Sequence, residues 1–228
     1  MLLLSVDTTT PAGSVALLRN TALLSEVNCD SSLTYSERLL PALHTILETQ
    51  GLKISDIDAF ALAVGPGSFT GIRIGVSTIK SLALASGKLV APVSSLDAYA
   101  MKLHMDGGRR LACPFLDAKK GEVYSALFEF RCGQIIEIIA QGAYSPDDIL
   151  SRLPSNRIVG FIGNGVSVYR EKIVSSLKDK ARLSSRSLFI AREVGLLGYK
   201  ALKDNRGVLS GDVKPLYFRK SQAEEKHQ

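Results

Sequence analysis

Hydrophobic residues along this chain fall into short runs and into stretches with helical spacing, which polar or glycine-containing turns separate. The chain opens with three short apolar runs that predict a strand meander, and Asp7 ends the first of them. Helical and strand-like segments then alternate. The elements predicted for the first half are strands at 2–6, 14–19 and 22–27, a helix at 35–50, a strand at 59–64, a helix at 68–86, a strand at 89–93 and a helix at 94–105.

The second half of the chain repeats this order, and Asp117 ends its first strand as Asp7 does in the first half. The elements predicted there are strands at 111–116, 122–130 and 135–140, a helix at 146–153, a strand at 157–162, and helices at 166–177 and 188–202. A meander followed by alternating helices and strands, twice over, predicts a duplicated α/β architecture. Because MDGGRR holds the chain's one glycine pair, we place the domain boundary there, giving domains 1–106 and 107–228.

The helix at 35–50 has one apolar side. Thr34 and Glu37 have the spacing of a capping box, and Pro41 either kinks the helix or marks its true start. The apolar stripe consists of Leu39, Leu40, Leu43, Ile46 and Leu47.

The helix at 68–86 carries a seam of small residues. Gly71 and Gly75 lie one turn apart, beside Ile72, Val76 and Ile79. Such a seam packs in the chain's own core or admits the helix of a partner. Since this helix is apolar or small on nearly all sides, we favour the partner.

The segment GPGSFTGIRIG, residues 65–75, is the most specific pattern in the chain. It predicts a sharp turn between a buried strand and a helix that Ser68 caps. A Walker loop does not fit, because no lysine follows Gly71, and the spacing of Gly65, Gly67 and Gly71 is one residue too long for a Rossmann turn. Arg73, near the positive end of the helix, is either solvated or paired with a carboxylate or phosphate.

Charge and composition restrict the functional classes. Residues 1–103 carry 7 Lys or Arg against 8 Asp or Glu, whereas residues 104–228 carry 21 against 14. The basic second half either meets RNA phosphate or consists of solvated helix faces; without interleaved aromatic residues we favour the second. Three widely spaced cysteines predict buried thiols rather than disulfides or a zinc site. No apolar run reaches transmembrane or signal-peptide length, so we expect a cytoplasmic protein without membrane contact.

Catalytic and metal-binding patterns are missing from the sequence. Its three histidines, at 44, 104 and 227, form no pair with metal-ligand spacing, and no serine or cysteine lies in a nucleophile elbow. Asp7 and Asp117 either meet a metal-bound nucleotide or cap the turns that follow them. We therefore expect no tightly bound metal or cofactor.

Seven segments resemble the TsaB (YeaZ) family, whose members take part in the biosynthesis of threonylcarbamoyladenosine on tRNA. They are LLSVDTT, SERLLP, GPGSFTGIRIG, SSLDAYA, LDAKKGEVY, IGNG and PLYFRKSQA, and they extend over the whole chain. The resemblance implies the fold of actin, Hsp70 and sugar kinases (the ASKHA fold), with two related α/β halves. Relatives with that fold bind ATP through D-x-G-T turns. The corresponding turns here, at 7–10 and 117–120, lack the glycine, so the resemblance implies at most weak nucleotide ligands at Asp7, Thr8, Arg73 and Asp117.

By the same resemblance, this is a non-catalytic subunit that pairs with a TsaD-type transferase and works with a TsaE-type ATPase. The resemblance implies pairing through the first two helices, homodimers when TsaD is absent, and ATP or ADP, if bound, at the joint. Any contact with tRNA is then indirect. The implied interface residues are Tyr35, Glu37, Leu39, Leu43, His44, Phe69, Gly71, Ile72, Arg73, Gly75, Val76 and Ile79. The alternatives are an ATP-dependent kinase of the actin-like superfamily, which would need phosphate turns with glycine, and a protease, which would need a metal or a nucleophile.

Overall fold

The computed structural model describes residues 1–29, 35–107 and 110–219, so Thr34 of the expected capping box lies outside the described residues. Contacts divide the chain into two compact units. The first unit consists of Met1–Ala98 and Phe189–Tyr217, and the second of Tyr99–Leu188 with the chain from Phe218 onward. This division differs from the expected boundary at 106/107, because the last helix packs on the sheet of the first unit.

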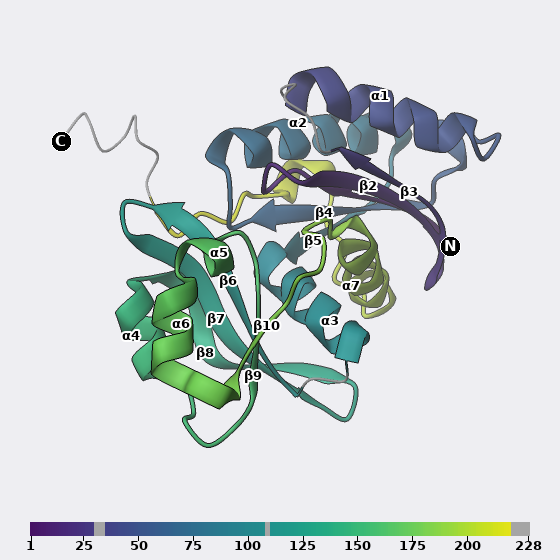
Figure 1. Cartoon of the computed structure of the whole chain (residues 1–228). Coiled ribbons are helices and arrows are strands. Elements are labelled where there is room, and N and C mark those ends of the chain that lie inside the picture. The colour runs from purple at the N-terminus through teal and green to yellow at the C-terminus, as the bar shows by residue number, and fades with distance from the viewer. Residues whose placement is uncertain (30–34, 108–109, 220–228) are drawn as a thin grey trace. The chain divides into compact units, whose positions relative to one another are not determined.

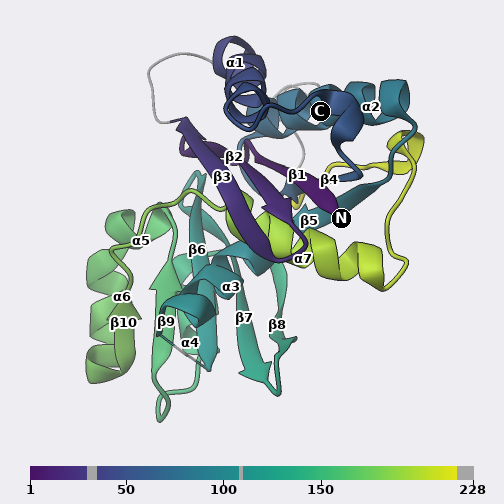
Figure 2. The ribbon, with the colours of Figure 1, turned by 90° about the vertical axis from the view of Figure 1, so that its right-hand side faces the viewer.

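The first unit is built on a five-stranded sheet with the order β3-β2-β1-β4-β5. Strand β1 pairs antiparallel with β2 and parallel with β4, so a meander continues into a parallel region. Helices α1 and α2 cover one face of this sheet and α7 covers the other (Figures 1 and 2). The strands are β1 (Leu2–Asp7), β2 (Gly13–Arg19), β3 (Ala22–Cys29), β4 (Ala59–Gly65) and β5 (Val90–Ser94). The helices are α1 (Tyr35–Glu48), α2 (Phe69–Ser86), α7 (Ala191–Lys203) and the start of α3 (Ser95–Gly107).

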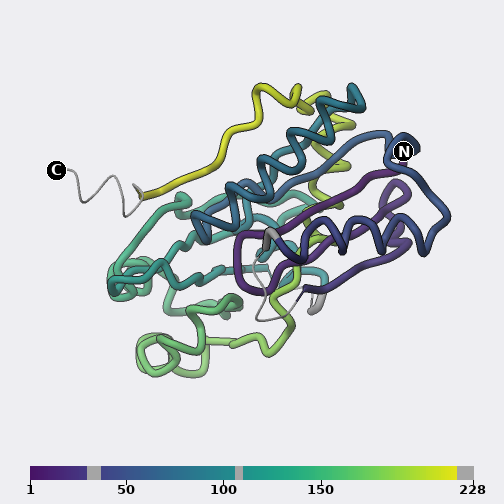
Figure 3. The backbone as a smooth tube through the Cα atoms, turned by 90° about the horizontal axis from the view of Figure 1, so that it is seen from above, coloured from purple at the N-terminus to yellow at the C-terminus, as the bar shows by residue number. Residues whose placement is uncertain are grey.

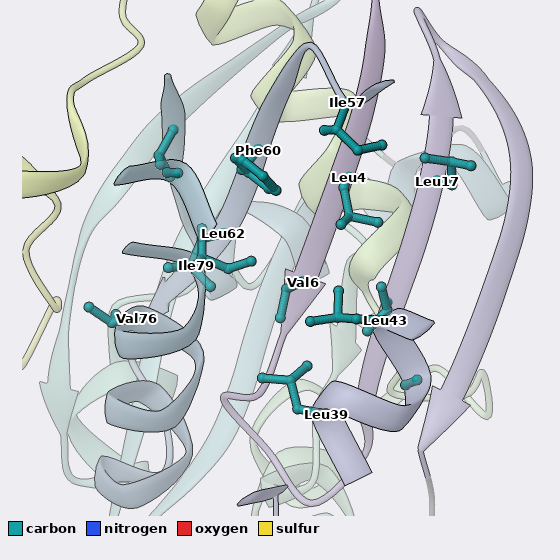
Figure 4. Close-up of a cluster of buried hydrophobic side chains, with 14 of the residues drawn as sticks. Leu4, Val6, Leu17, Leu39, Leu43, Ile57, Phe60, Leu62, Val76 and Ile79 are labelled. Carbon is teal, nitrogen blue, oxygen red and sulfur yellow. The ribbon is translucent and has the colours of Figure 1, made fainter. Parts of the chain in front are cut away.

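Side chains of α1 and α2 fill the main core of the first unit. Leu39 and Leu43 of α1 and Val76 and Ile79 of α2 are buried against strand residues such as Leu62 (Figure 4). Leu40 departs from the predicted stripe. Its side chain is 58% exposed, because it lies about 100° around the helix from Leu39.

Helix α1 begins at Tyr35 and contains Pro41, so the proline does not mark its start. Helix α2 begins as predicted: Ser68 is its N-cap and accepts a hydrogen bond from the Gly71 N–H at 3.3 Å. Gly87, in the left-handed conformation, ends the helix.

The second unit repeats the topology, with the sheet order β10-β9-β6-β7-β8. Its strands are β6 (Leu111–Lys119), β7 (Glu122–Arg131), β8 (Gln134–Tyr144), β9 (Val159–Ile162) and β10 (Ala181–Leu183). Its helices are α4 (Pro146–Ser151), α5 (Gly165–Val168) and α6 (Arg170–Leu177), with most of α3. The predicted helix at 166–177 is divided at Tyr169, and β10 escaped prediction because three residues give no periodicity.

The cysteines differ in exposure. Cys113 is buried, Cys29 is half-buried and Cys132 is exposed, so the expectation of buried thiols is correct for Cys113 alone. Cys132 is exposed because it lies in the turn between β7 and β8 with a positive φ of 49°. Among the described helices, none is long and apolar enough to cross a membrane.

Candidate partner-binding surface

The turn after β1 is buried inside the first unit. Asp7 accepts hydrogen bonds through Oδ1 from the Thr9 N–H at 2.8 Å and the Thr9 hydroxyl at 2.6 Å. Its Oδ2 is buried without a hydrogen-bond partner. Burial raises the pKa of Asp7 to about 6; the hydrogen bonds from Thr9 oppose this rise, and the negative charge of Glu193 adds to it.

The glycine-rich loop between β4 and α2 closes over this turn. The Ser68 N–H donates to the Thr9 carbonyl at 2.6 Å, and a Cβ on Gly67 would overlap that same carbonyl group. The Thr8 hydroxyl donates to the Gly71 carbonyl at 2.7 Å, and a Cβ on Gly75 would overlap that hydroxyl. Glycines 67 and 75 therefore serve close packing within the chain.

The prediction that Gly71 and Gly75 admit a partner helix is therefore wrong, because Gly75 faces Thr8 and Leu62 of its own unit and Gly71 is buried, with its carbonyl bonded to Thr8. Five other interface candidates are also buried in the first unit. The interface candidates that are buried in the first unit are Leu39, Leu43, Gly71, Ile72, Gly75, Val76 and Ile79. Of the nucleotide candidates in this unit, Asp7 and Thr8 are each 1% exposed and bonded within the turn and loop, whereas Arg73 is exposed.

The corresponding turn after β6 buries its acid less completely, because the Asp117 side chain is 11% exposed. Asp117 is only partly buried, and its carboxylate accepts from the Lys119 N–H at 2.9 Å and from Lys119 Nζ at 2.7 Å. Partial burial raises the pKa of Asp117, but the hydrogen bonds and charge of Lys119 outweigh it and hold the pKa below its usual range. The Asp117 N–H donates to Asn164 Oδ1 at 3.0 Å, so the IGNG segment supports this turn from α5. Both acids thus bond to their own turns, as the capping alternative expected.

The exposed sides of α1 and α2 form a second candidate site. We call it the α1–α2 face; it consists of Glu37, Leu40, Pro41, His44, Thr70, Arg73, Ser77, Ser81 and Leu84. Leu84 is 74% exposed and Leu40 is 58% exposed, although both are large and apolar. On α1, His44 lies 3.5 Å from Glu48, one turn along the helix.

The middle of the exposed side of α2 carries two small side chains, Ser77 and Ser81, whose hydroxyls are bonded within the helix. The Ser77 hydroxyl donates to the Ile74 carbonyl at 3.1 Å, and the Ser81 hydroxyl donates to the Ser77 carbonyl at 2.9 Å. Hydroxyls that bond back to their own helix leave few polar groups to be desolvated when another surface approaches.

Arg73 lies at one end of this exposed side. Its guanidinium carbon is 3.9 Å from the centroid of the Phe69 ring, which is a cation–π contact. Helix α2 contains no acidic residue, so nothing on its own helix offsets this charge.

Comparison with known proteins decides the family. A sequence profile described as "TsaD: tRNA N6-adenosine threonylcarbamoyltransferase" matches residues 30–226. The tRNA threonylcarbamoyladenosine biosynthesis protein TsaB of Bacillus subtilis is 31% identical over 231 residues, which cover 99% of this chain and 97% of that protein. The chain belongs to the TsaB family.

Solved structures agree with this TsaB assignment. YeaZ from Pseudomonas aeruginosa is 28% identical and superposes with a TM-score of 0.81, covering 95% of this chain and 99% of that one. The ROK hexokinase of Thermus thermophilus, at 13% identity and a TM-score of 0.51, shares the fold, with 89% of this chain and all of that one covered. The expected actin-like fold is thereby confirmed, and the TsaB family connects the chain to the biosynthesis of threonylcarbamoyladenosine on tRNA.

The TsaB expectations for the surface now separate into two groups. Glu37, His44 and Arg73 are exposed and Phe69 is half-buried, so these remain available to a partner. Tyr35 begins α1, but its side chain lies outside the described residues. Sequence reasoning missed Leu84 and placed Leu40 in the core stripe. Leu84 directly follows the buried Ala83 in an apolar helix, so only the three-dimensional packing distinguishes the two.

Proposed function

We propose that this chain is a non-catalytic subunit that binds a TsaD-type transferase through the α1–α2 face. Together with a TsaE-type ATPase, the pair forms threonylcarbamoyladenosine next to the anticodon of tRNA in the cytoplasm. The observation that carries the proposal is the exposure of Leu84 and Leu40 on two helices that share one face of the sheet. Large apolar side chains that leave water at the centre of an interface stabilise the complex through the hydrophobic effect.

The shape of α2 supports a helical partner. Between Arg73 and Leu84 the exposed side offers Ser77 and Ser81, which are small and already bonded to their own helix. A second helix can therefore approach closely without leaving buried polar groups unpaired.

Charge supports an acidic partner surface. Arg73 is the basic residue that α2 contributes to the α1–α2 face, and no Asp or Glu along this helix offsets its charge. Opposite charge across an interface speeds association and excludes wrong partners.

A role through binding is also supported by the turn after β1. The glycine loop closes over Asp7 and Thr8: Asp7 Oδ1 accepts from Thr9, the Thr8 hydroxyl donates to the Gly71 carbonyl, and Asp7 Oδ2 is buried. We accordingly place ATP or ADP, where one binds, at the joint with the transferase and not at this turn. Homodimers in the absence of the transferase would use the same face, and contact with tRNA would be made mainly by the partner.

The test is calorimetric titration of the chain with a TsaD-type transferase, comparing two variants that each place one aspartate at an exposed apolar residue. Leu84→Asp buries an unpaired charge in the proposed interface, and we expect affinity to fall about thirtyfold or more, equivalent to about 2 kcal/mol. Val168→Asp, on α5 in the second unit, is the control, because Val168 is 60% exposed. Equal affinities of both variants and the wild type would contradict the proposal.

A further inference from the structure

We infer that the C-terminal strap, residues 208–217, positions Arg73 to receive a carboxylate of the partner, with Tyr217 as the positioning residue. The inference rests on the proposed function and specifies the chemistry of that surface. It starts from two aromatic rings that are 148 residues apart in the sequence but in contact in the first unit.

Arg73, Phe69 and Tyr217 form a continuous stack. The Arg73 guanidinium lies 3.9 Å from the Phe69 centroid, and the Phe69 and Tyr217 centroids are 4.6 Å apart with an interplanar angle of 27°. Because Phe69 is the first residue of α2, its ring has few helix neighbours to fix it. Tyr217 supplies that support, so the stack holds a long and flexible side chain in one orientation.

The strap is itself anchored to the first unit, beside α2 (Figure 3). The Leu216 N–H donates to the Val64 carbonyl at 2.8 Å, at the end of β4. Lys80 Nζ donates to the carbonyl groups of Gly211 at 3.2 Å and Val213 at 3.4 Å. Val208 exchanges two hydrogen bonds with Val90 on β5. Tyr217 is therefore attached to a fixed backbone.

The stacked Arg73 side chain is suited to a carboxylate. A guanidinium in cation–π contact with a ring retains its five N–H donors, and two of them can bind a carboxylate as a bidentate pair. Arg73 is exposed and, within the described part of the chain, lies in no ion pair. A cation near the positive end of a helix is unfavourable by itself, and a carboxylate from the partner would offset that cost.

The experiment is a double-mutant cycle on affinity for a TsaD-type transferase, read by calorimetry with the full chain. We expect Arg73→Ala to weaken binding about thirtyfold and Tyr217→Ala about fivefold, since the second loses only the orientation of the guanidinium. Tyr217→Phe retains the ring and should bind like the wild type. In the Arg73→Ala background, Tyr217→Ala should have no further effect.

The matched control is Tyr199→Ala on α7, which also removes a tyrosine beside a cation, Lys203 at 5.8 Å. Helix α7 covers the opposite face of the sheet, so binding should be unchanged. A second measurement uses the free chain, without the transferase. It is the NMR chemical shift of the Arg73 Nε–H, which the ring current of Phe69 displaces. Tyr217→Ala should move this signal toward its free value, and Tyr199→Ala should not.

The two proposals fail in different ways. If the wild-type chain does not bind the transferase, the proposed function is overturned, and so is the inference that Arg73 binds a carboxylate of the transferase. If the wild type binds but Tyr217→Ala leaves affinity and the Arg73 signal unchanged, only the positioning role of Tyr217 is overturned. An equal loss from Tyr217→Ala in both backgrounds would also overturn it.

Discussion

The turns after β1 and β6 occupy equivalent places in two sheets of the same topology, yet their acids are in opposite electrostatic states. Asp7 is buried with its pKa raised to about 6, whereas Asp117 is partly exposed, paired with Lys119, and has a lowered pKa. The loops that follow β4 and β9, the strands paired in parallel with β1 and β6, explain much of the difference. In the first unit GPGSFTG lies directly on the turn, and in the second unit Asn164 supports the turn from one side.

This comparison teaches that a repeated topology does not preserve repeated chemistry. The first unit uses its acidic turn for packing and presents the exposed side of two long helices. In the second unit Asp117 of the turn pairs with Lys119, and the helices in the equivalent places are shorter. Helix α4 has 6 residues where α1 has 14, and α5 and α6 have 4 and 8 where α2 has 18. Partner binding accordingly belongs, in this account, to the first unit.

The largest expected effect is on the pH dependence contributed by Asp7. Its folded pKa is raised, so the folded state binds the proton more tightly than the unfolded chain does, and stability falls as pH rises from about 4 to 6. Relative to Asp7→Asn, the wild type should lose about 3 kcal/mol of unfolding free energy across this window and no more above it. Urea unfolding at a series of pH values measures the difference; parallel curves for the two proteins would contradict it.

Asp117→Asn is the matched change in the second unit, and it should give the opposite sign. Because the folded pKa of Asp117 is lowered, its contribution is present above the unfolded pKa and disappears as pH falls through the folded value. The Lys119 side chain is 77% exposed, so we expect no more than about 1 kcal/mol. If the unfolding free energy attributable to Asp117 changed with pH by as much as that attributable to Asp7, the predicted difference between the two turns would be contradicted.

A smaller effect is expected at Gly75, where the turn meets α2. An added Cβ would overlap the Thr8 hydroxyl, so Gly75→Ala should destabilise the chain by about 1–2 kcal/mol, even though alanine is the better helix former. Gly211→Ala is the control, because no atom lies within 4 Å of its added Cβ. Thermal unfolding decides between the two outcomes; stabilisation by Gly75→Ala would mean that the glycine is not held against the turn.

Most of the fold could be predicted from the sequence, because long apolar periods and glycine turns are local signals. The meanders at 2–27 and 111–140 and the helix at 68–86 illustrate this. The pairing of α7 with the first sheet could not be predicted, since nothing in the local pattern of 188–202 says which of two similar sheets it covers.

The candidate site was less predictable. The motif GPGSFTGIRIG identified the right loop, but Gly75 and Val76 face inward, and a periodicity of small residues does not state which side meets the sheet. Contact between Phe69 and Tyr217 depends on the path of a strap without regular structure. Exposure of Leu84 likewise follows from packing alone.

The most direct test of the account is reconstituted tRNA modification by a TsaD-type transferase and a TsaE-type ATPase, with this chain supplied as wild type, Asp7→Asn or Leu84→Asp. We expect modification to require the chain, to proceed with Asp7→Asn at the wild-type rate, and to fall at least tenfold with Leu84→Asp at concentrations near the dissociation constant. Full activity of Leu84→Asp together with loss of activity in Asp7→Asn would contradict the account, because function would then depend on the buried turn and not on the α1–α2 face.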